Sequence, residues 1–111
     1  MKFIYLMSSE DSDGLVTYKI GLTKNNPEIR CKQLQCGNPN IISIIYEYKS
    51  IYPHETEAYL HRIFKLSNIH NEWFDLNLDQ VSKFLYFCQQ GDDIYKLLNT
   101  ENTYYNQSLN K

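Results

Sequence analysis

The sequence predicts a small α+β domain in which an antiparallel sheet of about three strands is packed by helices, in the order β-β-α-β-α-α. Three observations support this fold class. Two apolar runs in the first 22 residues are separated by a polar turn, Asn26-Pro27 marks the start of a helix, and residues 41–50 are β-branched and aromatic almost throughout. A length of 111 residues corresponds to a single domain.

The first two strands are expected at residues 2–7 and 15–22, joined by the loop SSEDSDG at 8–14 to form a hairpin. Alternation along the second strand separates its side chains into two sets. Tyr18 lies with Val16, Ile20 and Leu22 on one face, while Lys19 and Gly21 lie on the other.

The first helix is expected from Asn26-Pro27-Glu28, where Asn caps the helix and Pro occupies its first position, to Cys36. Gly37 is a suitable residue for the helix end, and residues 37–40 form a turn before the strand at 41–50. Pro53 opens a second helix over residues 54–65. Residues 68–72 read as a loop, and residues 73–76 as a short extended piece.

Residues 78–98 have helical spacing of apolar side chains, and Gly91-Asp92-Asp93 is expected to divide this region into two helices. The domain is therefore predicted to span residues 1–98, with a motif-bearing core at 3–75 and a helical part at 78–98. Residues 99–111 are predicted to form a polar, flexible tail.

The formal net charge of −2 argues against a basic, non-specific nucleic-acid coat protein. Residues 19–65, however, carry seven Lys or Arg against four Glu, so the middle of the chain can meet phosphate. No apolar run reaches the roughly 18 residues of a membrane span. Three cysteines outside any CxxC motif, with no export signal, predict a soluble intracellular protein with reduced thiols.

Two helical faces carry polar residues beside apolar ones. A helical projection places Arg30 between Ile29 and Leu34 on the semi-buried side. The Arg30 guanidinium either pairs with a structural acid or faces a phosphate. On the second helix, Glu57 and His61 share a face with Leu60. They form either a local pair or a site for a hard cation.

Together these residues resemble the GIY-YIG endonuclease superfamily. The chain is most similar to a phage- and virus-associated branch, the bacteriophage T-five open-reading-frame DNA-binding domain family. The resemblance spans residues 3–75. It is carried by Ile4-Tyr5, the run Tyr18-Lys19-Ile20-Gly21-Leu22-Thr23, Arg30, the phrase Gln33-Leu34-Gln35-Cys36-Gly37-Asn38-Pro39, Glu57 with Leu60-His61 and Phe64, and Glu72-Trp73-Phe74.

The resemblance implies hydrolysis of a DNA phosphodiester with one divalent metal, Mg²⁺ or Mn²⁺. It assigns to Tyr5 the activation or positioning of the attacking water, and to Arg30 the stabilisation of charge on the phosphate. Lys19 stands where the superfamily has its second tyrosine, and an ammonium there is expected to lower the pKa of Tyr5. Phe3 stands where the first glycine would be.

The metal-binding carboxylate is the largest departure from the superfamily. The aligned position holds His61, so Glu57, one turn earlier, is the candidate ligand, with His61 and Glu72 as alternatives. The candidate catalytic residues are Tyr5, Lys19, Arg30, Glu57 and His61. The candidate DNA-binding residues are Lys24, Arg30, Lys32, Arg62 and Lys65. The motif residues with structural roles are Tyr18, Gly21, Gly37, Trp73 and Phe74.

These residues predict a DNA-binding domain that acts as a metal-dependent endonuclease. Two alternatives stay open, namely a DNA-binding or regulatory module that has lost catalysis and a protein-interaction domain on the same fold. The resemblance also fits a phage or virus origin, and the sequence leaves the oligomeric state open.

Overall fold

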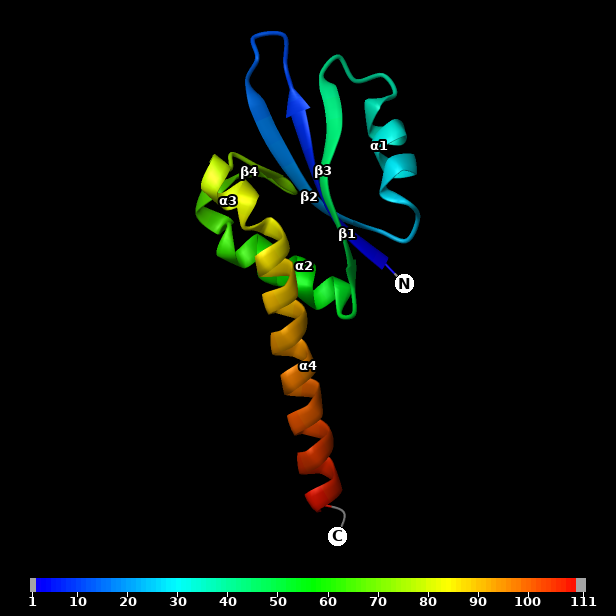
Figure 1. Cartoon of the computed structure of the whole chain (residues 1–111), viewed down its shortest axis with the longest axis vertical. Helices are drawn as coiled ribbons and strands as arrows, with labels where there is room; N and C mark the ends of the chain where they lie inside the picture. The colour runs from blue at the N-terminus through cyan, green and yellow to red at the C-terminus, as the bar shows by residue number, and fades with distance from the viewer. Residues whose placement is uncertain (1, 110–111) are drawn as a thin grey trace.

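The computed structural model describes residues 2–109, with side chains described for residues 2–100 (Figure 1). The strands are β1 (Lys2–Glu10), β2 (Val16–Thr23), β3 (Ile41–Ser50), β4 (Asn68–His70) and β5 (Trp73–Phe74). The helices are α1 (Pro27–Gln35), α2 (Pro53–Ile63), the short 3-10 helix η1 (Lys65–Ser67), α3 (Leu78–Ser82) and α4 (Phe84–Leu109). The α+β class is confirmed.

The sheet has five antiparallel strands in the order β3-β1-β2-β5-β4, so it is larger than the three strands predicted. The predicted loop at 68–72 contains β4, and β5 pairs with Tyr18 and Lys19 of β2. Strands of two and three residues are too short to show an alternating pattern. They meet at a tight turn where Asn71 adopts a left-handed φ of 53°.

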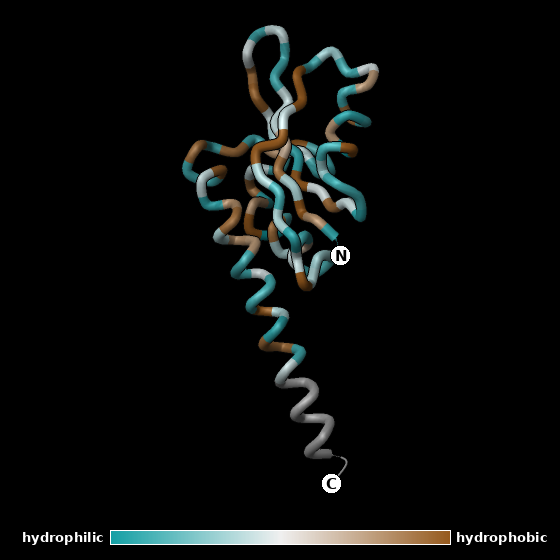
Figure 2. Tube along the Cα trace, turned by 45° about the vertical axis from the view of Figure 1, so that its right-hand side comes forward, coloured by the Kyte–Doolittle hydropathy of each residue, from teal (hydrophilic) through white to brown (hydrophobic). Residues whose placement is uncertain are grey.

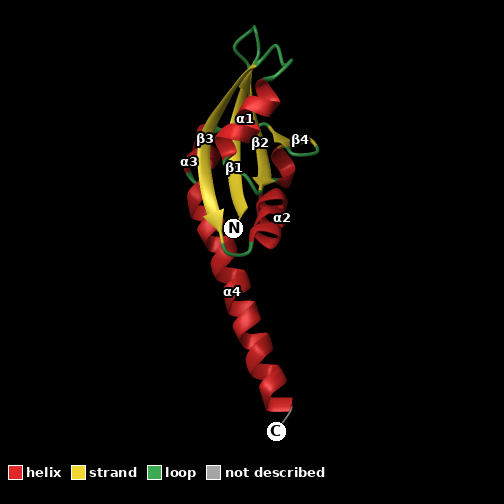
Figure 3. Ribbon diagram, turned by 90° about the vertical axis from the view of Figure 1, so that its right-hand side faces the viewer, coloured by secondary structure: helices red, strands yellow, loops and turns green. Residues whose placement is uncertain are grey.

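The two faces of the sheet are covered by different helices (Figure 3). On one face, helices α2 and α4 cover the larger core, which includes Ile4, Leu6, Ile20, Leu60, Phe64, Phe74, Phe84 and Cys88. On the other face, α1 covers a smaller core of Tyr5, Met7 and Ile42, with Trp73 packed beside it. The predicted alternation of β2 is confirmed, because Tyr18 and Ile20 belong to the larger core while Lys19 lies on the α1 side.

Helix α1 begins as predicted. The Asn26 side chain accepts a hydrogen bond from the Glu28 amide at 2.9 Å, and Pro27 follows it. The expected buried arc is wrong at Ile29, which is 49% exposed. Leu34 packs on the sheet as expected, and Cys31 packs there in place of Ile29 because the buried face of α1 is rotated away from Ile29. Gly37 has a φ of 72°, as its position after the helix requires.

Helix α4 is continuous through Gly91-Asp92-Asp93, so the predicted break there is wrong. The chain instead separates α3 from α4 at Lys83. Gly91 is buried in α4 because α2 approaches closely; an added Cβ would lie 2.8 Å from Thr56 Cγ2 and 3.1 Å from Tyr59 Cδ2. The helix also continues to Leu109, past its predicted end at residue 98 (Figure 1). Its coloured part projects from the body of the domain in Figure 2. Residues 110–111 of the predicted tail lie outside the described residues.

Candidate functional site

The candidate site is centred on Tyr5, which is buried in the middle of β1. Tyr5 pairs across the sheet with Gly21 of β2. A Cβ at residue 21 would overlap the Tyr5 hydroxyl and the ring carbon that carries it. Glycine is therefore required at this position, because the phenol crosses the β2 backbone where a side chain would stand.

The pKa of Tyr5 is raised. Burial of the phenol is the largest cause, and the negative charges of Glu72 and Glu57 act in the same direction. A hydrogen bond with Arg30 opposes the shift. The overall direction is opposite to the lowering expected from Lys19, because burial outweighs the one opposing cation, Arg30, and the phenol stays protonated at neutral pH.

Arg30 lies half-buried on α1, as predicted, with its guanidinium beside Tyr5. Its other contact is a long hydrogen bond of 3.5 Å from Nη1 to Gln33 Oε1. Among the residues with described side chains, Arg30 forms no ion pair with a carboxylate. Within this part of the chain no structural acid pairs with Arg30, and its positive charge is free to meet an anion.

Lys19 lies on the same face of the sheet and is 8% exposed. Its Nζ is 2.5 Å from Glu72 Oε2 and 5.5 Å from the centre of the Trp73 ring. Glu72 follows the Asn71 turn, and its carbonyl accepts a 3.0 Å hydrogen bond from the Ile20 amide, which fixes this turn against β2. The Glu72 carboxylate therefore holds the Lys19 ammonium over Trp73.

Glu57 reaches this cluster from α2. Its Oε2 atom is buried and has no hydrogen-bond partner. The pKa of Glu57 is raised to about 7, first by burial and then by the negative charge of Glu72, with Lys19 opposing both. An unpartnered, buried carboxylate oxygen is costly unless something binds it, and oxygen is the ligand that Mg²⁺ prefers.

Glu57 could hold a divalent cation in an open site, that is, one where the protein supplies only one or two of the ligands. Within the described side chains, no group of three or more His, Cys, Asp and Glu could enclose a metal ion. Mg²⁺ is commonly held by one or two carboxylates, with water and substrate phosphate completing its shell. Glu57, with Glu72 nearby, matches that kind of site.

His61 is engaged elsewhere. Its Nε2 lies 3.2 Å from the carbonyl oxygen of Ile20, and its ring meets Phe74 edge-on with 5.0 Å between ring centres. These contacts give His61 a packing role between α2 and β2. They engage Nε2 and leave Nδ1 as the ring nitrogen through which His61 could bind a metal.

The structural motif residues lie where a packing role requires. Phe74 is fully buried in the larger core and Trp73 packs beside Tyr5 on the opposite face, so the two residues seal both sides of the sheet at β5. Sequence reasoning missed Glu47 and Lys49, which lie across from Tyr5 and Phe3. Alternation in β3 puts them on one face, but only the strand register shows their neighbours.

The candidate DNA-binding residues do not all gather at this site. Lys24 is exposed directly after β2, and Arg30 is at the site itself. Arg62 donates a 3.0 Å hydrogen bond to the Tyr95 hydroxyl of α4, and Lys65 lies in η1. Arg62 is therefore held against α4 rather than beside Arg30 on α1.

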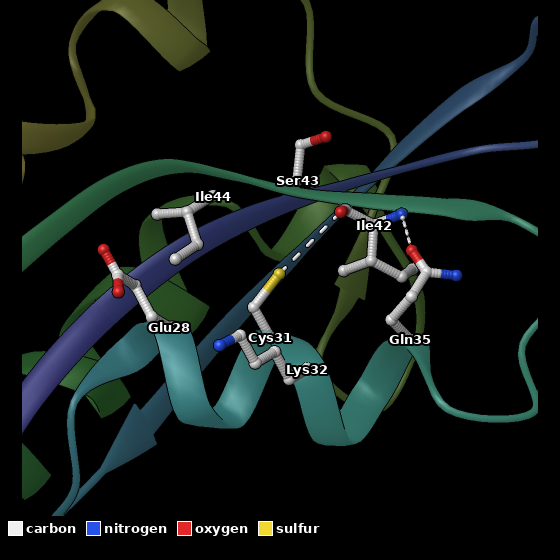
Figure 4. Close-up of a pocket in the computed structure, with 7 residues that line it drawn as sticks. All are labelled: Glu28, Cys31, Lys32, Gln35, Ile42, Ser43 and Ile44. Carbon is white, nitrogen blue, oxygen red and sulfur yellow. Dashed lines mark hydrogen bonds between the residues drawn. The ribbon is translucent and has the colours of Figure 1, made fainter.

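A cavity of about 380 Å³ lies between α1 and β3, beside the candidate site but not at it (Figure 4). It is lined by Glu28, Cys31, Lys32, Gln35, Ile42, Ser43 and Ile44. The Cys31 thiol donates to the Ile42 carbonyl and the Ile42 amide donates to Gln35 Oε1, and these two bonds hold α1 against the strand. Lys32 points toward this cavity, whereas Arg30, two residues earlier on the helix, lies beside Tyr5.

Residues 2–89 match the T5orf172 domain, and the chain belongs to this family. The family is phage-associated and comprises DNA-binding, nuclease-like domains. Comparison with curated proteins and with solved structures gives no significant match. None of the helices that the structure describes combines the length and the apolar character needed to cross a bilayer. The branch that the sequence resembles is thus confirmed.

Proposed function

We propose that this domain is a metal-dependent endonuclease of the GIY-YIG type, which hydrolyses DNA phosphodiesters at the Tyr5 site. The observation that carries the proposal is the convergence of Tyr5, Arg30, Lys19 and Glu57, which come from two strands and two helices. Cations that stabilise phosphate charge and a carboxylate that can hold a metal ion are groups that catalyse phosphoryl transfer.

Each group has a distinct task in this proposal. Arg30 binds the scissile phosphate and stabilises the charge that develops on it. The Tyr5 phenol, protonated at neutral pH, orients the attacking water by hydrogen bonding. Glu57 holds the divalent cation, with His61 and Glu72 as the alternative ligands. When bound, such a cation acts as a Lewis acid on the phosphate.

Plasmid cleavage tests the proposal. Purified protein is incubated with supercoiled DNA and Mg²⁺ or Mn²⁺, with EDTA in a parallel reaction. We expect metal-dependent nicking that falls about 100-fold in Arg30→Ala, the cost typical of losing one charge-stabilising donor. Lys96→Ala, which removes an exposed lysine on α4, is the matched control. Equal rates in the two variants, or no metal-dependent scission, would refute the nuclease.

A second candidate, a DNA-binding module without catalysis, is favoured by one specific observation. Lys19 replaces the second tyrosine of the superfamily and is held in an ion pair with Glu72. This module would bind DNA in a salt-sensitive manner, because phosphate contacts release counterions, and it would leave plasmid intact under either metal.

A further inference from the structure

The face of the sheet that carries Tyr5 extends beyond the site toward the start of β1. Phe3 lies two residues before Tyr5 and therefore on the same face. Its cross-strand neighbours are Thr23 of β2 and Lys49 of β3, just as Gly21 and Glu47 flank Tyr5. Cross-strand side chains on one face are about 5 Å apart, so Phe3 stands directly between Thr23 and Lys49.

This end of the face is left open by the fold. Tyr5 and Met7 are buried under α1, whereas Phe3 is partly exposed and belongs to neither core cluster. Figure 3 shows α1 lying across the upper part of the sheet, while the lower ends of β1 and β3 extend past it. Part of the Phe3 side chain is therefore accessible to a ligand at this end of the sheet.

The charges around Phe3 indicate what that ligand is. Lys49 is exposed beside the ring, and Lys24 is exposed directly after Thr23. Glu47, the acid on the neighbouring strand, lies directly across from Tyr5 and not from Phe3. An aromatic surface flanked by cations is the combination that binds single-stranded nucleic acid, where bases stack and phosphates meet lysine.

We infer that Phe3 is a stacking platform for an unpaired base of the DNA substrate, with Lys49 and Lys24 contacting the phosphates that flank it. This inference rests on the proposed function, which places the scissile phosphate beside Tyr5 on the same face of the sheet. Two residues of strand span about 6.6 Å, close to one nucleotide of an extended single strand. The platform therefore selects DNA that carries an unpaired nucleotide next to the scissile phosphate.

Binding without cleavage tests this inference. Fluorescein-labelled single-stranded DNA and a blunt duplex of the same sequence are titrated with the full chain in EDTA, and anisotropy is recorded. Phe3→Leu, which keeps an apolar side chain but removes the ring, is expected to weaken single-strand binding about tenfold or more and duplex binding much less. Phe3→Tyr, which keeps the ring, should restore single-strand binding. Tyr86→Leu removes an exposed ring on α4 and is the control.

Salt dependence separates stacking from charge. Phe3→Leu should leave the slope of log affinity against log salt unchanged, whereas Lys49→Gln should reduce it by about 0.7 on a single strand. The inference is overturned if Phe3→Leu binds single strands like the parent, or if it loses single-strand and duplex binding equally. Because these titrations contain no metal, absence of plasmid nicking would refute the nuclease and leave this result standing.

Discussion

Glu57 is a buried acid with an unpartnered oxygen, and this makes its charge a cost to the fold. Its pKa is raised from an ordinary value of 4.5 to about 7, with burial as the largest cause. The folded state therefore holds this proton more tightly than the unfolded state. The contribution of Glu57 to stability is largest below pH 4.5 and is lost as pH rises through about 7.

Glu57→Gln should remove this pH dependence. A neutral amide avoids the cost of a buried charge, so we expect the variant to be more stable than the parent at pH 8 by roughly 1–2 kcal/mol and to lose this advantage at pH 4.5. Urea unfolding at both pH values measures it. A stability gain of equal size at the two pH values would show that Glu57 is not the titrating group.

Gly21 is a second residue whose role is set by one contact. A methyl group there would overlap the Tyr5 hydroxyl and its ring carbon. Gly21→Ala should therefore destabilise the fold by about 1–3 kcal/mol, the usual cost of overpacking, and should displace the phenol from Arg30. Denaturant unfolding gives the first effect and the cleavage rate gives the second.

A double-mutant cycle assigns the Gly21 effect to Tyr5. With the ring shortened in Tyr5→Leu, the added methyl group has room, so Gly21→Ala should cost much less in that background. An unchanged cost would mean that the strain arises from the β2 backbone and not from the phenol.

At the scale of elements, Asp92 joins α4 to the end of β3 and the start of α2. Its carboxylate accepts hydrogen bonds from Ser50 Oγ at 2.6 Å, Thr56 Oγ1 at 2.7 Å and the Ile51 amide at 2.9 Å, and further bonds come from Tyr48 and Tyr52. Burial alone would raise the pKa of Asp92, but these donors outweigh it and the pKa is lowered. The stability that they provide is present near neutral pH and is lost as pH falls through the folded-state pKa.

Asp92→Asn should destabilise the domain by about 2–4 kcal/mol, because an amide NH₂ would face donors and the buried network would lose its charge. Asp93→Asn is the matched control, since Asp93 is exposed and accepts its bond from Gln89 on the same helix. Thermal unfolding of both variants at pH 7 compares them. Similar melting temperatures would contradict the anchoring role of Asp92.

The segment around Asp92 shows why some elements could be predicted from the sequence and others could not. The hairpin, the start of α1 and the strand at 41–50 follow from local patterns, namely alternation, the Asn-Pro cap and β-branched residues. Gly91-Asp92-Asp93 carries a local signal for a turn, yet it is helical. Thr56 and Tyr59 approach residue 91 so closely that glycine is needed there, and five hydrogen-bond donors bind the carboxylate of Asp92. These partners are distant in sequence, so no local pattern contains them.

The candidate site likewise contains residues that the sequence predicts and contacts that it does not. Tyr5 and Lys19 follow from the resemblance, whereas Arg30 and Glu57 are also indicated by the helical faces on which they lie. The ion pair of Lys19 with Glu72 and the packing of His61 on Ile20 depend on how α2 and β5 meet β2. The register of β3 likewise decides that Lys49 lies beside Phe3. Such relations follow from tertiary contacts alone.

At the scale of the whole molecule, charge is distributed unevenly. Residues 19–65 carry a net charge of +3, whereas residues 66–111, which contain α3 and α4, carry −3. Because Lys24 directly follows β2 and Arg30 lies on α1, we expect DNA to approach the sheet and α1 rather than α4. This arrangement favours one orientation even though the chain is acidic overall.

This asymmetry predicts that cations on the Tyr5 side carry duplex binding. Lys24→Gln should reduce the slope of log affinity against log salt by about 0.9, because one phosphate contact is lost. Arg62 lies five residues after Glu57 on α2, about 140° around the helix, and bonds Tyr95. Arg62→Gln should therefore leave the slope unchanged, as should Lys96→Gln on α4. Anisotropy titrations of a duplex at several salt concentrations measure all three slopes. If Arg62→Gln lowered the slope as much as Lys24→Gln, the DNA would have to contact the α2–α4 side, and the one-sided orientation would be excluded.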